Sequence, residues 1–534
     1  MLMTIDGFRK SLLAACLSAH PVPLWANPTV GDVVAGSAGI SSSGNTLTVT
    51  QASNNAIIDW RGFSIGQGEL TRFIQPSAQS YVLNRVTGGD PSAIYGTLQA
   101  NGRVFLINPN GITVGPTGVI DTQSFVASTL DLSNDDFMAG GAMLFSGSSA
   151  ASLINTGRIS ALGGDVILIA HTVRNTGDIS AAEGTAALAA GTEVLIQPSG
   201  GERVFVKAGG EGKSVVGVDQ QGQIAAATAE LKAAGGNVYS LAINNAGIIQ
   251  ASGVERRGGR VYLIAEGENI ALRSGSVIDA SGANGGGTVL VGGDTQGLNP
   301  DVPNASAITI EQGATIKADA LANGDGGKVV VWGTDNASFR GLISAKGGAE
   351  GGNGGSVEVS GGHLDFGGMV DATAPRGLLG SLLLDPFNLT ISNSADNVAD
   401  TANPDSSTGD GSNLSVATLV GQLAGANVTV QTGGSSPASQ LGDITVADAI
   451  TWGGPAAGSL TLRADNDIII NSAITSNGGG AVRLSADGGN GTILLNSNIT
   501  TSGGGQTYSG AVALGGDVAL NTGGGDILFS STIN

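Results

Sequence analysis

A recurring pair of short β-type segments limits the folds that are open to this chain. In each copy, a run of the form Gly-x-Ile-x-Ala is followed, after a glycine-rich break, by a run of the form Gly-Gly-x-Val-x-Leu. The first clear copy begins at Asn155, and later copies begin at Ala246, Gly275, Gly313 and Gly341. Self-similarity of this kind is typical of a stack of like units, in which each unit buries one face on its neighbour.

The runs have the period of strands. Val, Ile or Leu alternates with Thr, Ser, Asp or Lys, which predicts half-buried strands. Successive copies are tens of residues apart and closely alike, so stacking like on like in parallel is a simpler arrangement than hairpins. One segment of helical period, Val416 to Leu423, is short enough to be a single capping or connecting turn. The pattern therefore predicts an all-β solenoid.

The composition suits a narrow core and excludes one class of partner. Glycine supplies 89 of the 534 residues, whereas aromatic residues make up 4 % and charged residues 12 %. Small and β-branched side chains can fill the interior of a thin solenoid. The net charge of −20 argues against nucleic-acid binding, which needs clustered Lys and Arg.

The N-terminus has the organisation of a signal peptide. Arg9 and Lys10 precede the apolar stretch Leu12 to Leu17, and the β-type pattern begins after Ala26. We therefore expect residues 1–26 to be removed by cleavage near Ala26.

The single cysteine, Cys16, falls inside this segment. Its removal would leave a mature chain without disulfides, which suits a polypeptide that crosses an oxidising periplasm unfolded. Leu13-Ala-Ala-Cys16 also fits a lipoprotein processing box, so lipid anchoring remains an alternative. No later stretch reaches the ~20 apolar residues that span a bilayer, so the mature chain is expected to be soluble or peripherally attached.

The most specific segment runs from Asn84 to Ile112. It contains, in order, an Asn-Arg-Val run, a Gly-x-Leu-x-Ala-Asn-Gly run and an Asn-Pro-Asn-Gly-Ile run. These runs resemble the secretion domain of two-partner-secretion exoproteins, the filamentous haemagglutinin family. The resemblance is close from Asn27 to about Gly140 and looser over the later repeats. The fold expected is therefore an all-β, right-handed parallel β-helix, to which small extra-helical β-hairpins can be added.

The resemblance implies a role for this segment in export and in nucleating folding at the cell surface. Physically, Asn108-Pro109-Asn110-Gly111 is a strong turn tetrapeptide, because proline fixes φ and Asn-Gly accepts a positive φ. A turn that closes a corner and a turn that the transporter reads are compatible interpretations. The candidate recognition positions are Asn84, Arg85, Asn101, Gly102, Asn108, Pro109, Asn110, Gly111 and Ile112.

The domain organisation follows from these patterns and from shifts in composition. The predicted units are a signal peptide (1–26), a secretion domain (27–260, most specific over 27–140), glycine-rich β-helix repeats (261–385), a polar connection or insertion (386–415) and further β-repeats (416–534). The repeat pattern is still running at Asn534, so we expect the repeats to continue beyond the chain end.

No residue pattern indicates catalysis, a metal site or a cofactor. The histidines of the mature chain, His171 and His363, are far apart in sequence, and no phosphate-binding loop is formed. No dense cluster of Asp with Arg stands out either. The asparagines that recur in the repeats are expected to form a buried amide ladder between coils. They are Asn155, Asn175, Asn244 and Asn245.

The resemblance implies a secreted or cell-surface exoprotein of a Gram-negative bacterium, exported through the periplasm and acting in adhesion. Its implied partner is an outer-membrane β-barrel transporter with periplasmic substrate-binding domains. A host-cell, matrix or carbohydrate receptor is a candidate second partner. Two alternatives remain open: the stalk of a contact-dependent toxin, and a β-helical polysaccharide-active enzyme. The enzyme predicts a groove that gathers acidic and basic side chains on one face of the rod.

Overall fold

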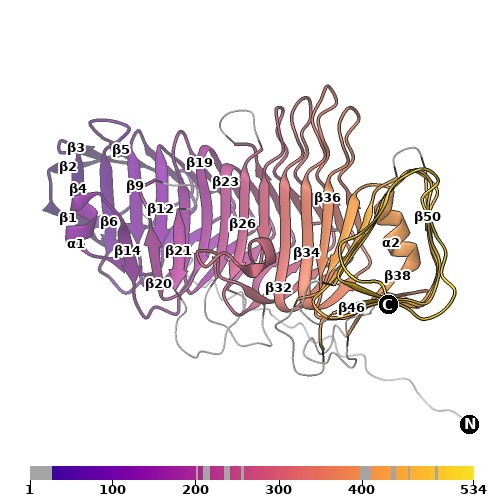
Figure 1. The fold of residues 1–534 in the computed structure, drawn as a ribbon. Helices are drawn as coiled ribbons and strands as arrows, with labels where there is room; N and C mark the ends of the chain where they lie inside the picture. The colour runs from indigo at the N-terminus through magenta and orange to yellow at the C-terminus, as the bar shows by residue number, and fades with distance from the viewer. Residues whose placement is uncertain are drawn as a thin grey trace, which may run out of the picture.

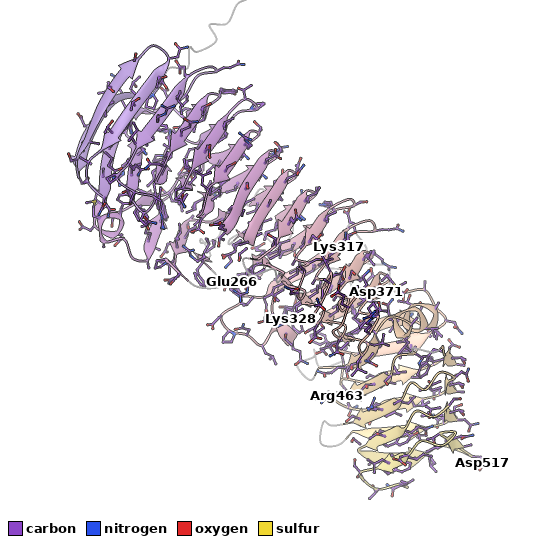
Figure 2. All side chains as sticks on the ribbon, turned by 90° about the horizontal axis from the view of Figure 1, so that it is seen from above. Glu266, Lys317, Lys328, Asp371, Arg463 and Asp517 are labelled. Carbon is purple, nitrogen blue, oxygen red and sulfur yellow. The ribbon has the colours of Figure 1, made fainter. Side chains whose placement is uncertain are left out.

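The computed structural model is a parallel β-helix. It describes residues 27–199, 203–207, 217–233, 241–253, 258–396, 411–433, 440–454, 457–486 and 491–534. The expected signal peptide, Cys16 and the cleavage position near Ala26 lie outside these residues. The coils stack into a long rod, with the N-terminal coils at one end and the C-terminal coils at the other (Figures 1 and 2). The all-β parallel fold expected from the sequence is confirmed.

Three stacks of parallel strands form the sides of the rod, named here stacks A, B and C. Stack A contains, in order, β4 (Asn55–Gly62), β6 (Tyr81–Val86), β9 (Arg103–Ile107), β12 (Ser124–Ser128), β17 (Val166–Ala170), the second halves of β19 (Asp178–Ala190) and β23 (Gln223–Ala233), β26 (Arg260–Ala265), β29 (Thr288–Val291), the first halves of β32 (Lys328–Phe339) and β34 (Ser356–Phe366), β36 (Ser381–Asp385), β39 (Asn427–Gln431), β42 (Leu460–Ala464), β45 (Val482–Ala486), β48 (Gln506–Ser509) and β51 (Ile527–Phe529).

Stacks B and C complete each coil. Stack B contains β3 (Thr46–Gln51), β5 (Leu70–Ile74), β8 (Thr97–Ala100), β11 (Val119–Thr122), β16 (Arg158–Ala161), the first halves of β19 and β23, β25 (Ile248–Ala251), β28 (Val277–Asp279), β31 (Thr315–Lys317), β33 (Leu342–Ser344), β35 (Met369–Asp371), β41 (Ile450–Trp452), β44 (Ile474–Ser476), β47 (Ile499–Thr501) and β50 (Leu520–Asn521). Stack C contains β7 (Ser92–Ile94), β10 (Ile112–Val114), β15 (Ser152–Asn155), β18 (Thr172–Asn175), β22 (Val218–Gln220), β24 (Leu241–Asn245), β27 (Asn269–Leu272), β30 (Ala305–Ile310), the second halves of β32 and β34, β38 (Ser412–Ser415), β37 (Leu389–Ser392), β40 (Ile444–Val446), β43 (Ile468–Ile470), β46 (Thr492–Leu495) and β49 (Ala511–Leu514).

A continuous apolar core fills the interior of the coils. In stack A, Leu168, Leu188, Leu231 and Leu263 lie in register on successive strands and are each at most 1 % exposed. Each inward side chain therefore packs on its counterpart one coil away, so that a narrow core is filled by repetition.

The N-terminal end of the rod is covered by antiparallel strands. β1 (Thr29–Ala35) pairs with β4, and β2 (Ala38–Ser43) forms a hairpin with β3. Because these strands run against the parallel stacks, they do not continue the coil and instead close it.

An additional antiparallel sheet lies outside the first coils. Its elements are β13 (Asp131–Leu132), α1 (Asn134–Ala139), β14 (Met143–Ser146), β20 (Glu193–Ile196) and β21 (Val204–Lys207). Between this extra-helical sheet and stack A is a second apolar core. Stack A contributes to it a column of outward-facing side chains that are at most 5 % exposed: Ile57, Leu83, Phe105, Val126 and Ile167.

Helix α2 (Val416–Leu423) replaces strands in stack B, where it lies between β35 and β41. Gln422 bonds to the edge of β35: its Oε1 accepts from the Val370 N–H (2.9 Å), and its Nε2 donates to the Gly368 carbonyl (3.2 Å). A helix is about 10 Å wide, roughly twice the ~4.8 Å strand spacing. Beside it, stack C has two strands between β34 and β40, β38 and then β37, out of sequence order, whereas stack A has one strand, β36, between β34 and β39.

The paired glycines of the repeats are required by the close approach of neighbouring coils. A Cβ on the first glycine of a pair would lie 1.9 Å from the Ala318 carbonyl oxygen at Gly286, and 1.8 Å from that of Ala372 at Gly354. On the second glycine, at Gly287, it would lie 2.1 Å from the carbonyl oxygen of Gly259. The Gly-Gly pattern is therefore a packing requirement.

The amide ladder expected from the sequence is present in stack C. Asn155 donates to Asn175 Oδ1 and Asn175 donates to Gln220 Oε1, both at 2.8 Å, and all three side chains are buried. Asn245 occupies the next position of this column. The prediction was wrong for Asn244, because alternate residues of a strand face opposite sides: it points outward, donates to Asp219 and accepts from Arg273.

Candidate functional site

The predicted recognition motif is built into the first coils. Asn84 is fully buried on β6, facing the interior. Its Oδ1 accepts from Trp60 Nε1 (2.9 Å), and its Nδ2 donates to the Phe105 carbonyl (3.1 Å). The side chain therefore links three successive coils and satisfies the buried indole N–H.

Arg85, the next residue, points outward and joins stack A to the extra-helical sheet. Its guanidinium donates to Asp131 Oδ1 (3.0 Å), Asn134 Oδ1 (2.9 Å) and the Leu132 carbonyl (2.7 Å). It also lies 3.5 Å from Asp59. A planar donor with five N–H groups suits such a junction better than lysine would.

Asn101 and Gly102 form a tight turn before β9. The Asn101 side chain pairs with the backbone of Gln75 in both directions, each at 2.8 Å. A Cβ at Gly102 would lie 2.6 Å from Gln75 Oε1. This turn therefore depends on an amide and a glycine at adjacent positions.

The Asn-Pro-Asn-Gly tetrapeptide closes a corner of the β-helix. Asn108 is fully buried, and it donates to the Asp90 carbonyl and to Ser92 Oγ, both at 3.0 Å. Asn110 donates from its backbone N–H to Asn108 Oδ1 (2.9 Å) and from its side chain to the Gly88 carbonyl (2.9 Å).

The tetrapeptide is followed directly by a strand of stack C. Gly111 has φ +111°, which favours glycine, and Ile112 enters the core of β10. At this corner Pro109 and Asn110 are exposed to solvent. Most side chains of the motif thus hold coils together, and its solvent-exposed residues are Asn101, Pro109 and Asn110.

Sequence reasoning missed the partners of the motif. Trp60, Gln75 and Ser92 supply hydrogen bonds to it, yet none stands in a recognisable pattern. Small extra-helical hairpins were expected without a position, and the signal for where they pack is two uninterrupted apolar runs, Val104 to Ile107 and Val166 to Ile169. Strands that are apolar at every position are buried on both faces.

A buried ion pair holds the far edge of the extra-helical sheet. Glu230 on β23 accepts from the backbone N–H groups of Arg203 (2.7 Å) and Val204 (2.9 Å). Lys232, which lies 3.4 Å from Glu230, donates to the Val204 carbonyl and lies over the Phe205 ring. The side chains of Glu230 and Lys232 thereby hydrogen-bond the backbone at the start of β21, which is an edge strand of the extra-helical sheet.

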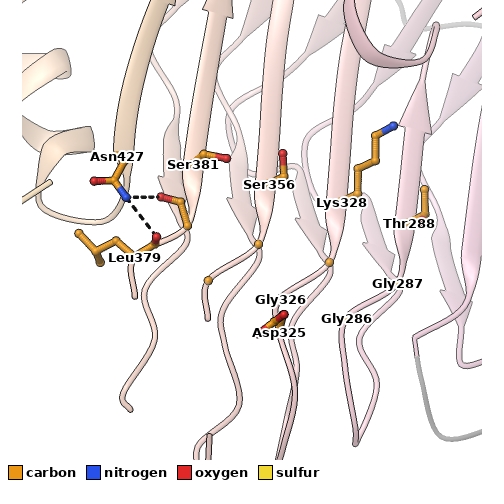
Figure 3. A pocket seen from close by; sticks show the side chains of 14 residues that line it. Gly286, Gly287, Thr288, Asp325, Gly326, Lys328, Ser356, Leu379, Ser381 and Asn427 are labelled. Carbon is orange, nitrogen blue, oxygen red and sulfur yellow. Dashed lines mark hydrogen bonds between the residues drawn. The ribbon is translucent and has the colours of Figure 1, made fainter. Parts of the chain in front are cut away.

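A groove of about 550 Å³ crosses several coils beside stack A (Figure 3). Paired glycines line the groove, together with the column Thr288, Lys328, Ser356, Ser381 and Asn427. Among its lining residues one carboxylate is present, on Asp325. Polysaccharide hydrolysis commonly uses two carboxylates that flank the bond, so this groove does not supply the constellation that the enzyme alternative requires.

Nowhere among the described residues do three or more His, Cys, Asp or Glu side chains gather in a way that could hold a metal ion. Nor does the described part of the chain contain a helix long and apolar enough to cross a membrane.

Comparison with known proteins identifies the family. The family model described as "TPS secretion domain" matches residues 26–278. The solved structure of the HMW1 secretion domain from Haemophilus influenzae aligns over its whole length, covering 67 % of this chain at 31 % identity with a TM-score of 0.51. This chain belongs to the two-partner-secretion exoprotein family. The family resemblance noted in the sequence is confirmed.

Two curated proteins match over shorter stretches. Two heme/hemopexin-binding proteins of Haemophilus influenzae are 44 % identical over 105 residues and 41 % identical over 91 residues. These matches cover 20 % and 17 % of this chain, but only 12 % and 10 % of those proteins. The filamentous hemagglutinin secretion domain aligns over 65 % of this chain and 99 % of its own length, at 17 % identity with a TM-score of 0.30.

Proposed function

We propose that residues 27–260 of this two-partner-secretion exoprotein are recognised and exported by an outer-membrane β-barrel transporter with periplasmic substrate-binding domains. The observation that carries this proposal is the motif from Asn84 to Ile112, which joins the first coils of a chain in this family. The signal peptide 1–26 would bring the chain to the periplasm, and the exported rod would lie outside a Gram-negative cell.

The motif acts, in this proposal, through folding as well as through contact. Asn84 and Asn108 are fully buried, so in the folded rod a transporter cannot touch them. Their amides instead close the first coils, on which later coils can stack once the chain emerges. Pro109 and Asn110 are exposed and remain available for direct contact.

The exported protein acts in adhesion, using the long regular sides of the rod to bind a host-cell, matrix or carbohydrate receptor. This part rests on the family and on the solenoid shape, which offers extended surfaces. A toxin stalk would share the same architecture, and residues after Asn534 would distinguish it. The heme/hemopexin-binding relatives match over about a tenth of their length, which supports shared export and does not extend to their ligand.

The test is transporter-dependent secretion of the chain from Met1 to Asn534. We expect it to reach the medium only when a cognate transporter is co-expressed, and Asn108→Ala to reduce the secreted amount at least about tenfold. Loss of Asn108 leaves the Ser92 hydroxyl and the Asp90 carbonyl without this partner, which destabilises the corner. Asn110→Ala should reduce secretion less, because its side chain is exposed.

Asn45→Ala is the matched control, since this asparagine sits at the exposed tip of the β2–β3 hairpin. It should be secreted like the native chain. Secretion without the transporter, or an Asn108→Ala chain secreted normally, would contradict the proposal. Retention in the membrane by lipid on Cys16 would favour the lipoprotein alternative instead.

A further inference from the structure

An asparagine followed by glycine is a chemically reactive pair, and this chain contains seven such pairs. The backbone nitrogen of the glycine can attack the side-chain amide carbon of the asparagine, and glycine hinders this attack least because it has no Cβ. The pairs begin at Asn101, Asn110, Asn284, Asn323, Asn353, Asn477 and Asn490. All except Asn490 lie among the described residues, so the surroundings of six pairs can be compared.

The attack makes three demands on a folded chain. The asparagine amide must be free to turn toward the backbone, the glycine N–H must be free to lose its proton, and the ring that forms needs space. A hydrogen bond to either group, or a neighbouring coil packed on the glycine, opposes the reaction, because that contact must open first.

Two pairs of the secretion motif are held in place. The Asn101 side chain pairs with the backbone of Gln75 in both directions, each at 2.8 Å. The Asn110 side chain donates to the Gly88 carbonyl at 2.9 Å, and the N–H of Gly111 donates to a carbonyl within the turn. The contacts that build the first coils therefore also oppose the reaction at these asparagines.

Two pairs in the glycine-rich repeats are held by the next coil. The N–H of Gly324, which follows Asn323, donates to a carbonyl of that coil at 2.9 Å. The N–H of Gly354, which follows Asn353, does the same at 2.9 Å. Both asparagine side chains are hydrogen-bonded as well. Neither the amide nor the attacking nitrogen is therefore free in these two pairs.

The pair at Asn477 has free groups but little space. Among the described residues, no hydrogen-bond partner is found for its side chain or for the N–H of Gly478. A Cβ on Gly478 would lie 2.2 Å from the Gly454 carbonyl oxygen, so the neighbouring coil packs directly on this glycine. The backbone of the pair can therefore move little.

Asn284 meets all three demands. It lies in the turn between β28 and β29, and it is exposed to solvent. Within the described part of the chain, neither its side chain nor the N–H of Gly285 has a hydrogen-bond partner. The atom nearest to a Cβ on Gly285 would be the Asp325 carbonyl oxygen, at 3.8 Å. Of the six glycines compared, Gly285 has the most open surroundings.

We propose that Asn284 is a site of spontaneous deamidation in the folded rod. The Gly285 nitrogen loses its proton to solvent and forms a bond to Asn284 Cγ, and ammonia leaves, so that a cyclic imide results. Water then opens the ring at either carbonyl, and the product is aspartate or isoaspartate. Each event adds one negative charge close to Gly286 and Gly287, which line the groove (Figure 3). The groove wall therefore changes its charge as the protein ages.

The test is peptide mapping by mass spectrometry of the full chain, kept folded at pH 8 and sampled over several weeks. Digestion in water labelled with heavy oxygen marks any deamidation that occurs during preparation. We expect Asn284 to deamidate at least about tenfold faster than the four pairs held by hydrogen bonds, with Asn477 between them. An Asn284 that reacts no faster than those four pairs would overturn the proposal.

The unfolded chain is the control for intrinsic reactivity. In guanidinium chloride the six pairs lose their contacts, so their deamidation rates should lie within about threefold of one another. If Asn284 remained at least about tenfold ahead of the others there, its selectivity would come from the local sequence instead of the fold. That result would also overturn the proposal.

Asn284→Gln is the matched variant, because its longer side chain keeps the amide but must close a larger ring. The peptide that contains residue 284 should stay unmodified over the same period, whereas Asn477 should react as in the native chain. Deamidation of that peptide at the native rate would show that the reaction does not depend on the ring formed with Gly285, and the assignment would be wrong.

Discussion

Stack A has the same interior at both ends of the rod but different exteriors. Near the N-terminus its outward column is apolar, and residues such as Phe105 and Ile167 lie under the extra-helical sheet. Further along the same column, at Thr429, Thr461 and Arg483, the side chains are polar and at least partly exposed. One strand stack can therefore carry a second layer at one end and face solvent at the other.

Coil stacking therefore constrains the inward side chains and leaves the outward ones free to vary. Leu168 and Leu462 face the same kind of interior, since both belong to the continuous core. The outward positions do not take part in coil stacking, so they can be used to add a sheet, bind a loop or keep the rod soluble.

Removing an outward aromatic side chain should matter only under the extra-helical sheet. Phe105 packs edge-on against Phe137 with ring centroids 5.4 Å apart, so Phe105→Ala should lower the local stability of β9 and β12 by about 3–5 kcal/mol. Thr461→Ala, in the same column, should change stability by less than about 0.5 kcal/mol. Hydrogen exchange of each strand measures both losses of stability, and equal losses would show that the outward column is packed alike in the two regions.

The buried amide ladder should contribute more to the stability of the rod than an exposed amide pair does. Asn175→Ala leaves both Asn155 Nδ2 and Gln220 Oε1 without a partner in the interior, which should cost roughly 2–4 kcal/mol in stack C. Asn496 donates to Asn471 Oδ1 on the surface, so Asn496→Ala should cost under about 0.5 kcal/mol. Hydrogen exchange of the backbone amides in β18 and β46 measures the two losses of stability. A small loss at Asn175 would mean that water satisfies the ladder.

Replacing a glycine where coils meet should destabilise the N-terminal and the C-terminal regions equally, because both regions depend on coil stacking. A Cβ would lie 2.1 Å from the Gly157 oxygen at Gly177, and 2.4 Å from the Gly480 oxygen at Gly504. Replacing either glycine by alanine should lower the free energy of unfolding, measured with urea, by about 1–3 kcal/mol. Gly141→Ala is the control with open space around it. Sensitivity at one end alone would show that the two ends stack differently.

Local sequence patterns predicted the parts of the molecule that depend on period and on turn chemistry. The alternation of apolar residues predicted the parallel solenoid, and the segment Val416 to Leu423 does form a short helix. The three runs from Asn84 to Ile112 predicted the family. The error at Asn244 came from the same logic, since a one-residue step along a strand moves a side chain to the opposite face.

The repeating unit can be predicted from the sequence, because inward periodicity, glycine pairs and turn tetrapeptides are local properties of the chain. The contacts between distant residues become visible only in the folded rod. Arg85 reaches Asp131, Glu230 receives the backbone of β21, and Gln296 spans two later coils. These contacts depend on how coils stack and on what lies over them, and no spacing along the chain encodes that geometry.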